Sequence, residues 1–471
     1  MPAAAAAPIS AASEMLAPLD LAFWNIESAE HPMHLGALGV FAADAADAAD
    51  GAPGSARRAA DLLIARAATV EGLRMRIRGV WLPVGGAVRE EAPGFDPRRH
   101  VHLAPAARDF HAAAGELMER PLDRERPPWE AHVLPGPDGT SFAVLFKFHH
   151  ALADGLRALT LAAGVMDPQP APPPRARRAV PEQRPGARHW LPGPLGLLNP
   201  RALNVAVRRT LGEVGQALDI GASVARATWG VRSAPALTSD ATGTRRTAGA
   251  VLDLDDVHRI RKRAGGTVND VLIALVAGAL RRWLDERGED GEDGAVLDDV
   301  APRALIPVSR RRPRAGQPQG NRLSGYLVRL PVGEQDPLAR LRTVRTAMDR
   351  NKDAGPTRGA GAVALLADHV PPLGHRLGGP VVAQAARLLF DILVTSVPLP
   401  SLGLTLDGCP LTEVYPFAPL AQGQSLAVAV STYRGRVHFG LVADAEAVPD
   451  LDRLTAALHE ELKELTEAVR A

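Results

Sequence analysis

The sequence predicts an α/β (α+β) protein of two lobes, and three observations support this. An alternating apolar run at 141–150 predicts a strand, and the residues from Asp154 to Leu161 predict the helix after it. The second half of the chain contains the same mixture of predicted strands and helices. Between the halves, residues 167–200 are too rich in proline and arginine to hold a regular element. We therefore expect three segments: an N-terminal lobe at 1–165, a Pro/Arg-rich linker with connecting helices at 166–245, and a C-terminal lobe at 246–471.

The second half begins and ends with clear secondary-structure patterns. A helix is expected from Thr267 to Arg287, because Thr267 and Asp270 have the spacing of a capping box. A C-terminal helix is expected after Asp450, a candidate N-cap, since the leucines that follow recur on one helical face. The strands expected in this half lie at 249–257, 304–309, 325–332, 425–433 and 436–444.

Composition limits the classes of function. The 471 residues are 46% hydrophobic and 23% charged, as in soluble globular proteins, and a net charge of +1 gives no bulk attraction for nucleic acid. Cys409 is the only cysteine, which excludes an internal disulfide and a thiolate metal cluster. The N-terminus does not resemble a signal peptide, and no uncharged apolar stretch reaches 18 residues. We expect a cytoplasmic protein that meets a membrane only from the side.

The candidate catalytic residues lie where the strand at 141–150 ends. The strand delivers His149 and His150 to its end, and the chain turns through Asp154 and Gly155 into a helix. A neutral imidazole at such a position can remove a proton from a hydroxyl group as the oxygen attacks a carbonyl carbon. Asp154 can instead cap the helix, and paired histidines can simply face solvent, so the spacing alone leaves both interpretations open.

The segment HHALADG matches the HHxxxDG motif of the CoA-dependent acyltransferase superfamily. Within that superfamily, the chain resembles the bacterial wax ester synthase/diacylglycerol acyltransferases. The resemblance extends over nearly the whole chain and is carried by these segments: PLDLAFW at 18–24, LRMRIR at 73–78, RPLDRERPPWE at 120–130, TVNDVLIA at 267–274, IPVSRR at 306–311, GN at 320–321, TSVPLP at 395–400 and YPFAPLAQGQSL at 415–426.

The resemblance implies two chloramphenicol-acetyltransferase-like lobes with mixed sheets, flanking helices and a tunnel between the lobes. It implies that acyl-CoA and an acceptor alcohol meet at His150, which acts as the general base beside His149. Asp154 would be structural and paired with an arginine of the first lobe, either Arg74 or Arg76. Gly155 would let the backbone turn where a side chain would crowd the tunnel.

Two segments depart from the family pattern. Pro127-Pro128-Trp129 stands where the family usually has PLW, and TSVPLP stands where it commonly has SNVPGP. These differences bear on the preference for acceptor and chain length, and they leave the histidines unchanged.

Several further residues are candidates for supporting roles. Asn269 and Asp270 match the family's ND pair, and Asp270 also fits a plain helix cap. Asn269 and a hydroxyl residue at 395–396 are candidate donors to an oxyanion. The basic residues Arg310, Arg311 and Arg312 suit the phosphates of CoA, although charge runs are usually solvated. No zinc-binding spacing, nucleophile elbow or phosphate-binding loop occurs, so we expect no metal and no cofactor besides the acyl-CoA co-substrate.

We therefore expect an O-acyltransferase that moves a long-chain acyl group from acyl-CoA to diacylglycerol, giving triacylglycerol, or to long-chain alcohols, giving wax esters. One alternative is a condensation-like enzyme with a non-lipid acceptor or a carrier-tethered donor. Another is a lipid-binding protein of the same fold without activity. The expected partners are these substrates and the surface of a membrane or lipid body, with the protein as a monomer or weak dimer.

Overall fold

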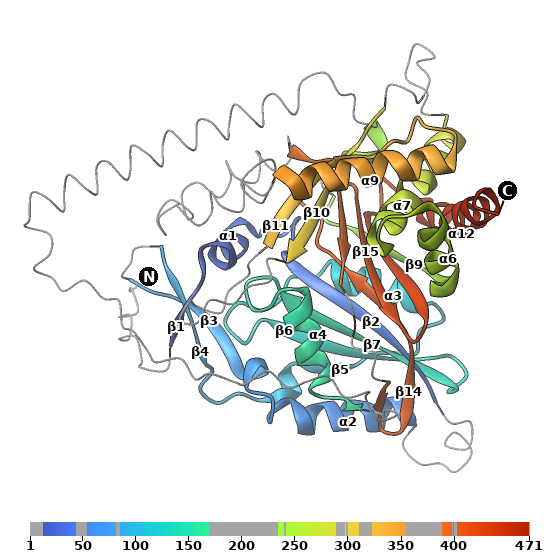
Figure 1. Ribbon diagram of the computed structural model, residues 1–471. Coiled ribbons are helices and arrows are strands. Elements are labelled where there is room, and N and C mark those ends of the chain that lie inside the picture. The colour runs from blue at the N-terminus through green and yellow to red at the C-terminus, as the bar shows by residue number, and fades with distance from the viewer. Residues whose placement is uncertain are drawn as a thin grey trace, which may run out of the picture.

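The computed structural model has two lobes, each built around one large β-sheet, and a small third sheet at one margin (Figure 1). Both large sheets mix parallel and antiparallel neighbours, so the predicted α/β class is confirmed. Most of the linker and its expected helices lies outside the residues that the structure describes. These are 13–43, 54–81, 85–168, 234–239, 242–288, 297, 300–309, 323–354, 389–397, 399 and 403–470.

The sheet of the first lobe has seven strands in the order β5-β6-β7-β2-β14-β13-β8. Its interior strand β7 is the predicted one and pairs antiparallel with β2 and β6 along its length. The strands are β2 (His34–Ala42), β5 (Val101–Leu103), β6 (Trp129–Pro135), β7 (Ser141–His149), β8 (Asp167–Pro168), β13 (Leu404–Leu406) and β14 (Cys409–Phe417).

The two faces of this sheet have different neighbours. The residues Phe142, Val144, Phe146 and Phe148 share one face, as their alternation predicts, and join a core with helices α2 (Ser55–Ala67) and α4 (Gly155–Ala163). The opposite face packs against helix α3 (Phe110–Met118) and the sheet of the second lobe. β7 is therefore buried on both sides, and its C-terminal end is held firmly.

The sheet of the second lobe has six strands in the order β11-β10-β12-β15-β16-β9. The hairpin β15–β16 is confirmed, and Arg434 and Gly435 both take positive φ at its turn. The strands are β9 (Arg245–Asp253), β10 (Arg303–Ser309), β11 (Leu323–Arg329), β12 (Ile392–Ser396), β15 (Leu426–Tyr433) and β16 (Arg436–Asp444). The first strand ends earlier than predicted, because a helix that the sequence analysis did not identify begins at Leu254.

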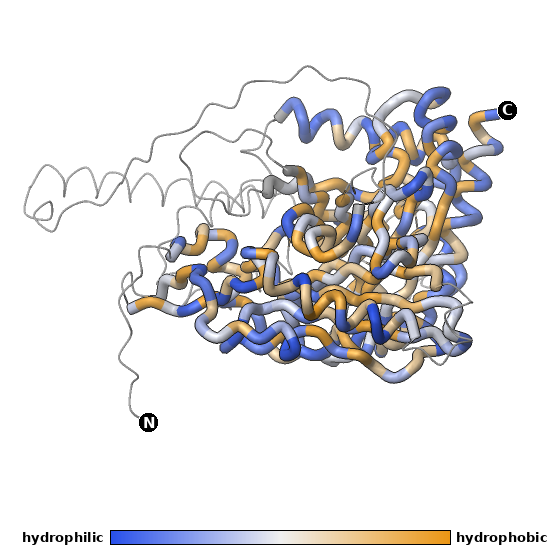
Figure 2. The backbone as a smooth tube through the Cα atoms, turned by 90° about the horizontal axis from the view of Figure 1, so that it is seen from below, coloured by the Kyte–Doolittle hydropathy of each residue, from blue (hydrophilic) through white to orange (hydrophobic). Residues whose placement is uncertain are grey.

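Within the described residues, four helices cover the second-lobe sheet: α6 (Leu254–Ala264), α7 (Val268–Glu286), α9 (Pro337–Ala354) and α12 (Leu451–Ala468). The capping box at the start of α7 forms as predicted. Asp450 stands at the N-cap of α12, but its side chain does not cap that helix. Its carboxylate instead accepts hydrogen bonds from the Trp283 indole and the Arg287 guanidinium. In Figure 2 the helix at the C-terminus alternates between hydrophilic and hydrophobic residues, as expected for a helix that covers a core.

The small sheet, in the order β1-β4-β3, lies beside helix α1 (Pro18–Ile26) at the end of the molecule opposite α12 (Figure 1). Its strands are β1 (Glu14–Met15), β3 (Met75–Gly79) and β4 (Ala87–Glu91). Ile77 and Ala87 of this sheet pack with Trp24 of α1 and with Ala151, which follows the histidine pair. The small sheet and α1 therefore support the loop that carries the histidines. Short 3₁₀ helices lie at Glu71–Arg74, Pro97–Arg99 and Pro235–Leu237.

Near the C-terminus, a segment from the second half of the chain joins the sheet of the first lobe. β13 and β14 belong by sequence to the predicted C-terminal lobe, yet they complete the sheet of the first lobe, where β14 pairs with β2. β14 also packs on the second lobe: the Ser431 hydroxyl donates to the Val414 carbonyl, and a side chain at Gly440 would clash with the carbonyl of Pro416. A single boundary at residue 246 is therefore wrong for 404–417, because sequence order does not reveal which sheet a strand joins.

Among the described helices, none taken alone has the length and apolarity to cross a bilayer. Only α6 and α7 taken together meet that criterion, and the chain bends by 103° between them.

Candidate active site

The two histidines lie at the C-terminal end of β7, where the strand turns toward α4. The His150 N–H donates to the carbonyl of Met33, which keeps the chain beside β2 for one more residue. The His149 ring is fully buried, and its Nδ1 accepts the N–H of Ala151 at 3.0 Å. This acceptor role leaves the proton of a neutral His149 on Nε2. His149 therefore shapes the turn that follows it.

Nε2 of His149 points toward a buried carboxylate. It lies 3.5 Å from Oε2 of Glu27, whose other oxygen accepts the N–H of Met33. Burial favours the neutral form of Glu27, but its contact with the His149 ring, the hydrogen bond from the Met33 N–H and the charge of Arg124 outweigh burial, so the pKa of Glu27 is lowered. Glu27 thus remains a charged partner that orients the His149 ring.

Arg124 completes this layer from the first-lobe segment that precedes β6. Its guanidinium stacks 3.8 Å from the ring centre of Trp24, donates to the Trp24 carbonyl and lies 3.8 Å from Glu27. Trp24 in turn meets His149 edge to face at 4.9 Å. Helix α1 is thereby fixed against the histidines.

His150 is stacked on Phe23 of the same helix, with 4.1 Å between ring centres. The residue stays partly accessible, but the surrounding protein removes most of the water from the ring. That burial, with a smaller effect of His149, outweighs the charge of Asp154 and lowers the pKa of His150 from 6.5 to about 4. A ring with this pKa is neutral at physiological pH, which is the form that accepts a proton.

Asp154 caps helix α4, which is the structural role that the sequence left open for it. Its Oδ1 accepts the N–H of Arg157 at 2.8 Å. Gly155 has an ordinary φ, so its role is not the turn that the resemblance implied. A Cβ on Gly155 would instead lie 3.1 Å from Val397 of the second lobe, and this close approach is what a side chain would disturb. The histidine loop therefore lies at the junction of the lobes.

The expected ion pair of Asp154 with Arg74 or Arg76 is wrong. Arg76 pairs with Glu90 at 2.7 Å, and Arg74 lies 3.2 Å from Glu91. Arg76 stands directly opposite Glu90 in the β3–β4 pair, and Arg74 directly precedes β3 beside the end of β4, so both side chains are nearer to β4 than to the distant loop.

The arginine that holds the loop is Arg89, which the sequence analysis did not identify. Its buried guanidinium donates to the carbonyl of Ala151 at 2.9 Å and lies 3.6 Å from the carboxylate of Asp20 on α1. Arg89 joins the small sheet, α1 and the loop, and it acts on the backbone rather than on Asp154. Glu27, Phe23, Trp24 and Arg124 were also missed as site residues, although Phe23 and Trp24 belong to the PLDLAFW segment that pointed to the family.

The remaining predicted residues do not gather at His150. Asp270 forms the capping box of α7 with Thr267, and neither Asn269 nor Asp270 forms a hydrogen bond or ion pair with the histidine loop. Thr395 and Ser396 precede Val397 at the end of β12, so they reach the lobe junction and remain candidate oxyanion donors. The CoA-phosphate candidates Arg310, Arg311 and Arg312 lie outside the described residues.

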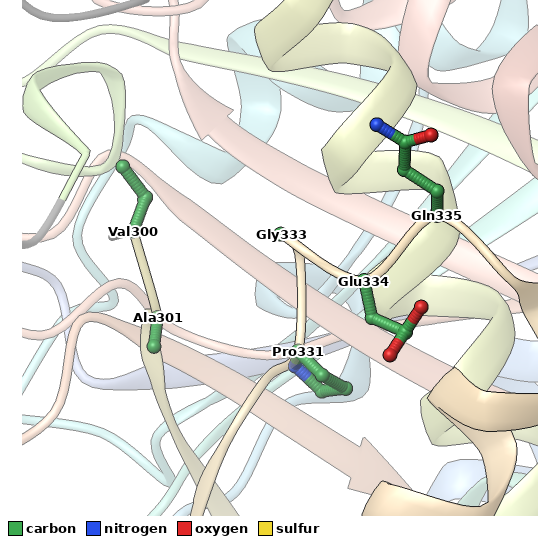
Figure 3. Close-up of a pocket in the computed structure, with 6 residues that line it drawn as sticks. All are labelled: Val300, Ala301, Pro331, Gly333, Glu334 and Gln335. Atoms are coloured by element: carbon green, nitrogen blue, oxygen red, sulfur yellow. The ribbon is translucent and has the colours of Figure 1, made fainter. Parts of the chain in front are cut away.

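Two pockets lie in the second lobe, and neither is lined by a residue of the histidine loop. The pocket in Figure 3 opens between two loop segments of the second lobe and is lined by Val300, Ala301, Pro331, Gly333, Glu334 and Gln335. A second pocket lies along α9. The described residues contain no cluster of three or more side chains suited to a metal ion.

The two-lobed fold, with an HHxxxDG loop at the junction of its lobes, defines an acyltransferase. The model of the wax ester synthase/diacylglycerol acyltransferase catalytic domain matches residues 16–272, and that of the WS/DGAT C-terminal domain matches residues 319–466. The chain belongs to this family.

Individual relatives agree with this placement. The chain is 31% identical to a Mycobacterium tuberculosis protein named probable diacylglycerol O-acyltransferase tgs2, over 97% of this chain and 99% of that protein. Its fold resembles the wax ester synthase/diacylglycerol acyltransferase of Marinobacter aquaeolei VT8, with a TM-score of 0.66, 24% identity and coverage of 97% and 100% of the two chains. It also resembles the TRI3 trichothecene 15-O-acetyltransferase of Fusarium sporotrichioides, with a TM-score of 0.58, 12% identity and coverage of 98% and 97%.

Replacing Arg89 tests which arginine supports the loop. Arg89→Ala should lower the free energy of unfolding by about 3–5 kcal/mol, because it takes the arginine away from the buried Asp20 carboxylate and from the Ala151 carbonyl. Arg74→Ala is the control and should change it by less than about 1 kcal/mol, since that pair is partly exposed. Urea denaturation followed by circular dichroism measures both. Equal losses for the two variants would contradict the assignment.

The lowered pKa of His150 predicts the pH dependence of activity. The folded protein takes up this proton only near pH 4, whereas the unfolded chain takes it up near 6.5, so stability from this group declines as pH falls from about 6.5 to about 4. The base form persists throughout that interval. The acid limb of kcat/KM for acyl-CoA should therefore have its midpoint near pH 4.

Samples returned to pH 7 after incubation at each pH control for unfolding in this measurement. A reversible midpoint at 6.5 would show that the ring titrates as an ordinary solvated histidine and is not buried in this way.

Proposed function

We propose that the enzyme transfers a long-chain acyl group from acyl-CoA to the hydroxyl of diacylglycerol, giving triacylglycerol, with long-chain alcohols as second acceptors. The observation that carries the proposal is the neutral His150 ring, partly accessible at the junction of the lobes and held by Phe23. The family match over residues 16–272 and the names of the relatives support the substrates.

In the proposed mechanism, His150 removes the hydroxyl proton as the alcohol oxygen attacks the thioester carbonyl. A tetrahedral oxyanion forms, the C–S bond breaks, and the CoA thiolate takes the proton back from the His150 ring. One base is sufficient because a thiolate is a good leaving group. Burial makes His150 a weak base in the ground state, so the proton moves to the ring as the forming C–O bond acidifies the hydroxyl.

His149 has a positioning role in this mechanism. Its Nδ1 accepts the Ala151 N–H, and its Nε2 lies 3.5 Å from the Glu27 carboxylate, so both nitrogens are directed at the protein. The first histidine therefore fixes the turn while the second faces the reactants. Asp154 and Gly155 continue the same turn: one caps α4, and the other leaves room for Val397.

Substituting His150 tests the mechanism and the product together. Purified protein would receive radiolabelled palmitoyl-CoA with diacylglycerol, hexadecanol or a long-chain amine, and the products would be separated by thin-layer chromatography. The parent protein should make triacylglycerol and less wax ester, and His150→Ala should lose nearly all activity. His459→Ala, which removes an exposed histidine of α12, is the control and should keep parental activity.

Turnover by His150→Ala within tenfold of the parent would overturn the role of this residue as base. Amide as the main product would favour a condensation-like acceptor. Binding of diacylglycerol without release of CoA would indicate a lipid-binding protein without activity.

We also propose that the enzyme works at the surface of a membrane or lipid body, where its acceptor is dissolved. Trp81 supports this proposal: it lies just beyond β3 at the margin of the molecule and is 74% exposed. Met15 on β1, the opposite edge strand of the small sheet, is a second exposed apolar side chain. Tryptophan favours the boundary between water and lipid, and this sheet supports the histidine loop through Ile77 and Ala151.

Trp81→Ala should weaken binding to phosphatidylcholine vesicles that contain diacylglycerol by about tenfold, because the indole no longer enters the lipid surface. Co-sedimentation with sucrose-loaded vesicles measures the binding. Leu103→Ala is the control, since it removes another exposed apolar side chain on β5. Unchanged binding of Trp81→Ala would rule out this contact.

A further inference from the structure

A groove of about 620 Å³ lies on the second lobe where helix α9 runs beside the edge strand β11 (Figure 1). Its floor includes Leu327 of the strand and Ala347 of the helix. The side-chain amide of Asn351 donates to the carbonyls of both residues, which ties the helix to the strand edge. The groove therefore has a fixed wall on each side.

The charged side chains that line this groove are all arginines: Arg329 of β11 and Arg342 and Arg350 of α9. No carboxylate of the described residues lines it. Arg342 lies 3.3 Å from Asp336, but both side chains are more than half exposed, so this pair contributes little and can give way to a stronger anion. Arg350 makes no ion pair with any residue that the structure describes. The acidic residues of α9, including Asp349, belong to other faces of the helix, where Asp349 pairs with Lys352.

The chemistry of the lining suits an anionic ligand such as a phosphate. Guanidinium groups form paired, charge-assisted hydrogen bonds with phosphate oxygens. The hydroxyl of Thr343 lines the same wall as an additional donor, whereas that of Thr346 is used by the carbonyl of Arg342. The apolar floor offers a surface on which an aromatic base can pack.

The register of the second-lobe sheet relates this groove to the histidine loop. β10 runs parallel to β12, with Leu305 opposite Leu393, so Ser309 lies level with the end of β12 where Val397 meets Gly155. β11 runs back from that level, with Leu323 opposite Ser309 and Arg329 at its far end. Six residues of strand span roughly 20 Å. The extended pantetheine arm of CoA bridges such a separation between a thioester and its nucleotide.

We propose that the groove between α9 and β11 binds the phosphate-bearing nucleotide end of acyl-CoA, with Arg342 and Arg350 as phosphate ligands. This inference rests on the proposed function, which makes acyl-CoA the donor. The acyl thioester then extends along the sheet toward the junction of the lobes, so the donor is bound by the second lobe and the base is supplied by the first.

Binding measurements without a lipid acceptor test the groove independently of catalysis. Calorimetric titration with CoA and with adenosine 3′,5′-bisphosphate, which lacks the pantetheine arm, would compare the parent protein with the double variant Arg342→Ala/Arg350→Ala. Both ligands should bind the variant at least about tenfold more weakly, because charge-assisted hydrogen bonds to phosphate are lost. Lys352→Ala removes one cation of α9 outside the groove and should bind both ligands as the parent does.

Kinetics provide a second readout in the same variants. The double variant should show a raised KM for palmitoyl-CoA with unchanged kcat, and an unchanged KM for the palmitoyl thioester of N-acetylcysteamine, which carries no phosphate. Binding of CoA within twofold of the parent, or an equal loss in Lys352→Ala, would overturn the groove as the site. A protein that binds CoA through these arginines but forms no lipid ester would leave the groove intact and overturn the proposed function instead.

Discussion

The position of His150 depends on one short turn, the three residues that follow β7. His149 accepts the N–H of Ala151 on its ring, Arg89 donates to the carbonyl of the same residue, and Asp154 caps the helix that follows. Each hydrogen bond satisfies a backbone group that the end of a strand or the start of a helix leaves unpaired. Because these partners come from the strand itself, the small sheet and the helix, the turn cannot shift without breaking contacts in all three.

This support has an electrostatic consequence for the two histidines. The first ring is surrounded by Glu27, Trp24 and the Ala151 N–H, so its hydrogen-bonding groups are directed at the protein. The second ring lies on Phe23, where burial outweighs the attraction of Asp154 and lowers its pKa. Adjacent residues with the same side chain therefore perform different tasks: one orders the loop, and the other remains neutral and ready to accept a proton.

Local patterns predicted local structure well. The alternation of Phe142 to Phe148 identified the buried face of β7, and Thr267 with Asp270 identified the start of α7, because both depend on neighbours within one element. The helix at Leu254 was missed because the expected strand extended over its first turn and its remaining residues are mostly charged.

The sequence could not predict which residues of distant segments are in contact. Arg74, Arg76 and Arg89 are equally good ion-pair partners by residue type. Only the fold directs Arg76, on β3, and Arg74, just before β3, to Glu90 and Glu91 of β4. The need for glycine at position 155 also comes from a distant residue. Val397, more than 200 residues away in sequence, leaves little room for a side chain there. The family resemblance identified Arg74, Arg76 and Gly155 as candidates, but the role of each depends on the residues that surround it in the fold.

The way in which β13 and β14 join the sheet of the first lobe explains how two lobes can hold one reactive centre. If the lobes met only through side chains, small shifts between them would change the distance from the base on the first lobe to a donor on the second. β14 instead pairs with β2, the strand that also flanks β7, while its other contacts reach β15 and β16. Gly440 brings the two backbones close enough that any side chain there would clash with Pro416. The end of β7 and the end of β12 are thus connected through backbone as well as side chains, and this connection fixes the separation between His150 and Val397 across the junction.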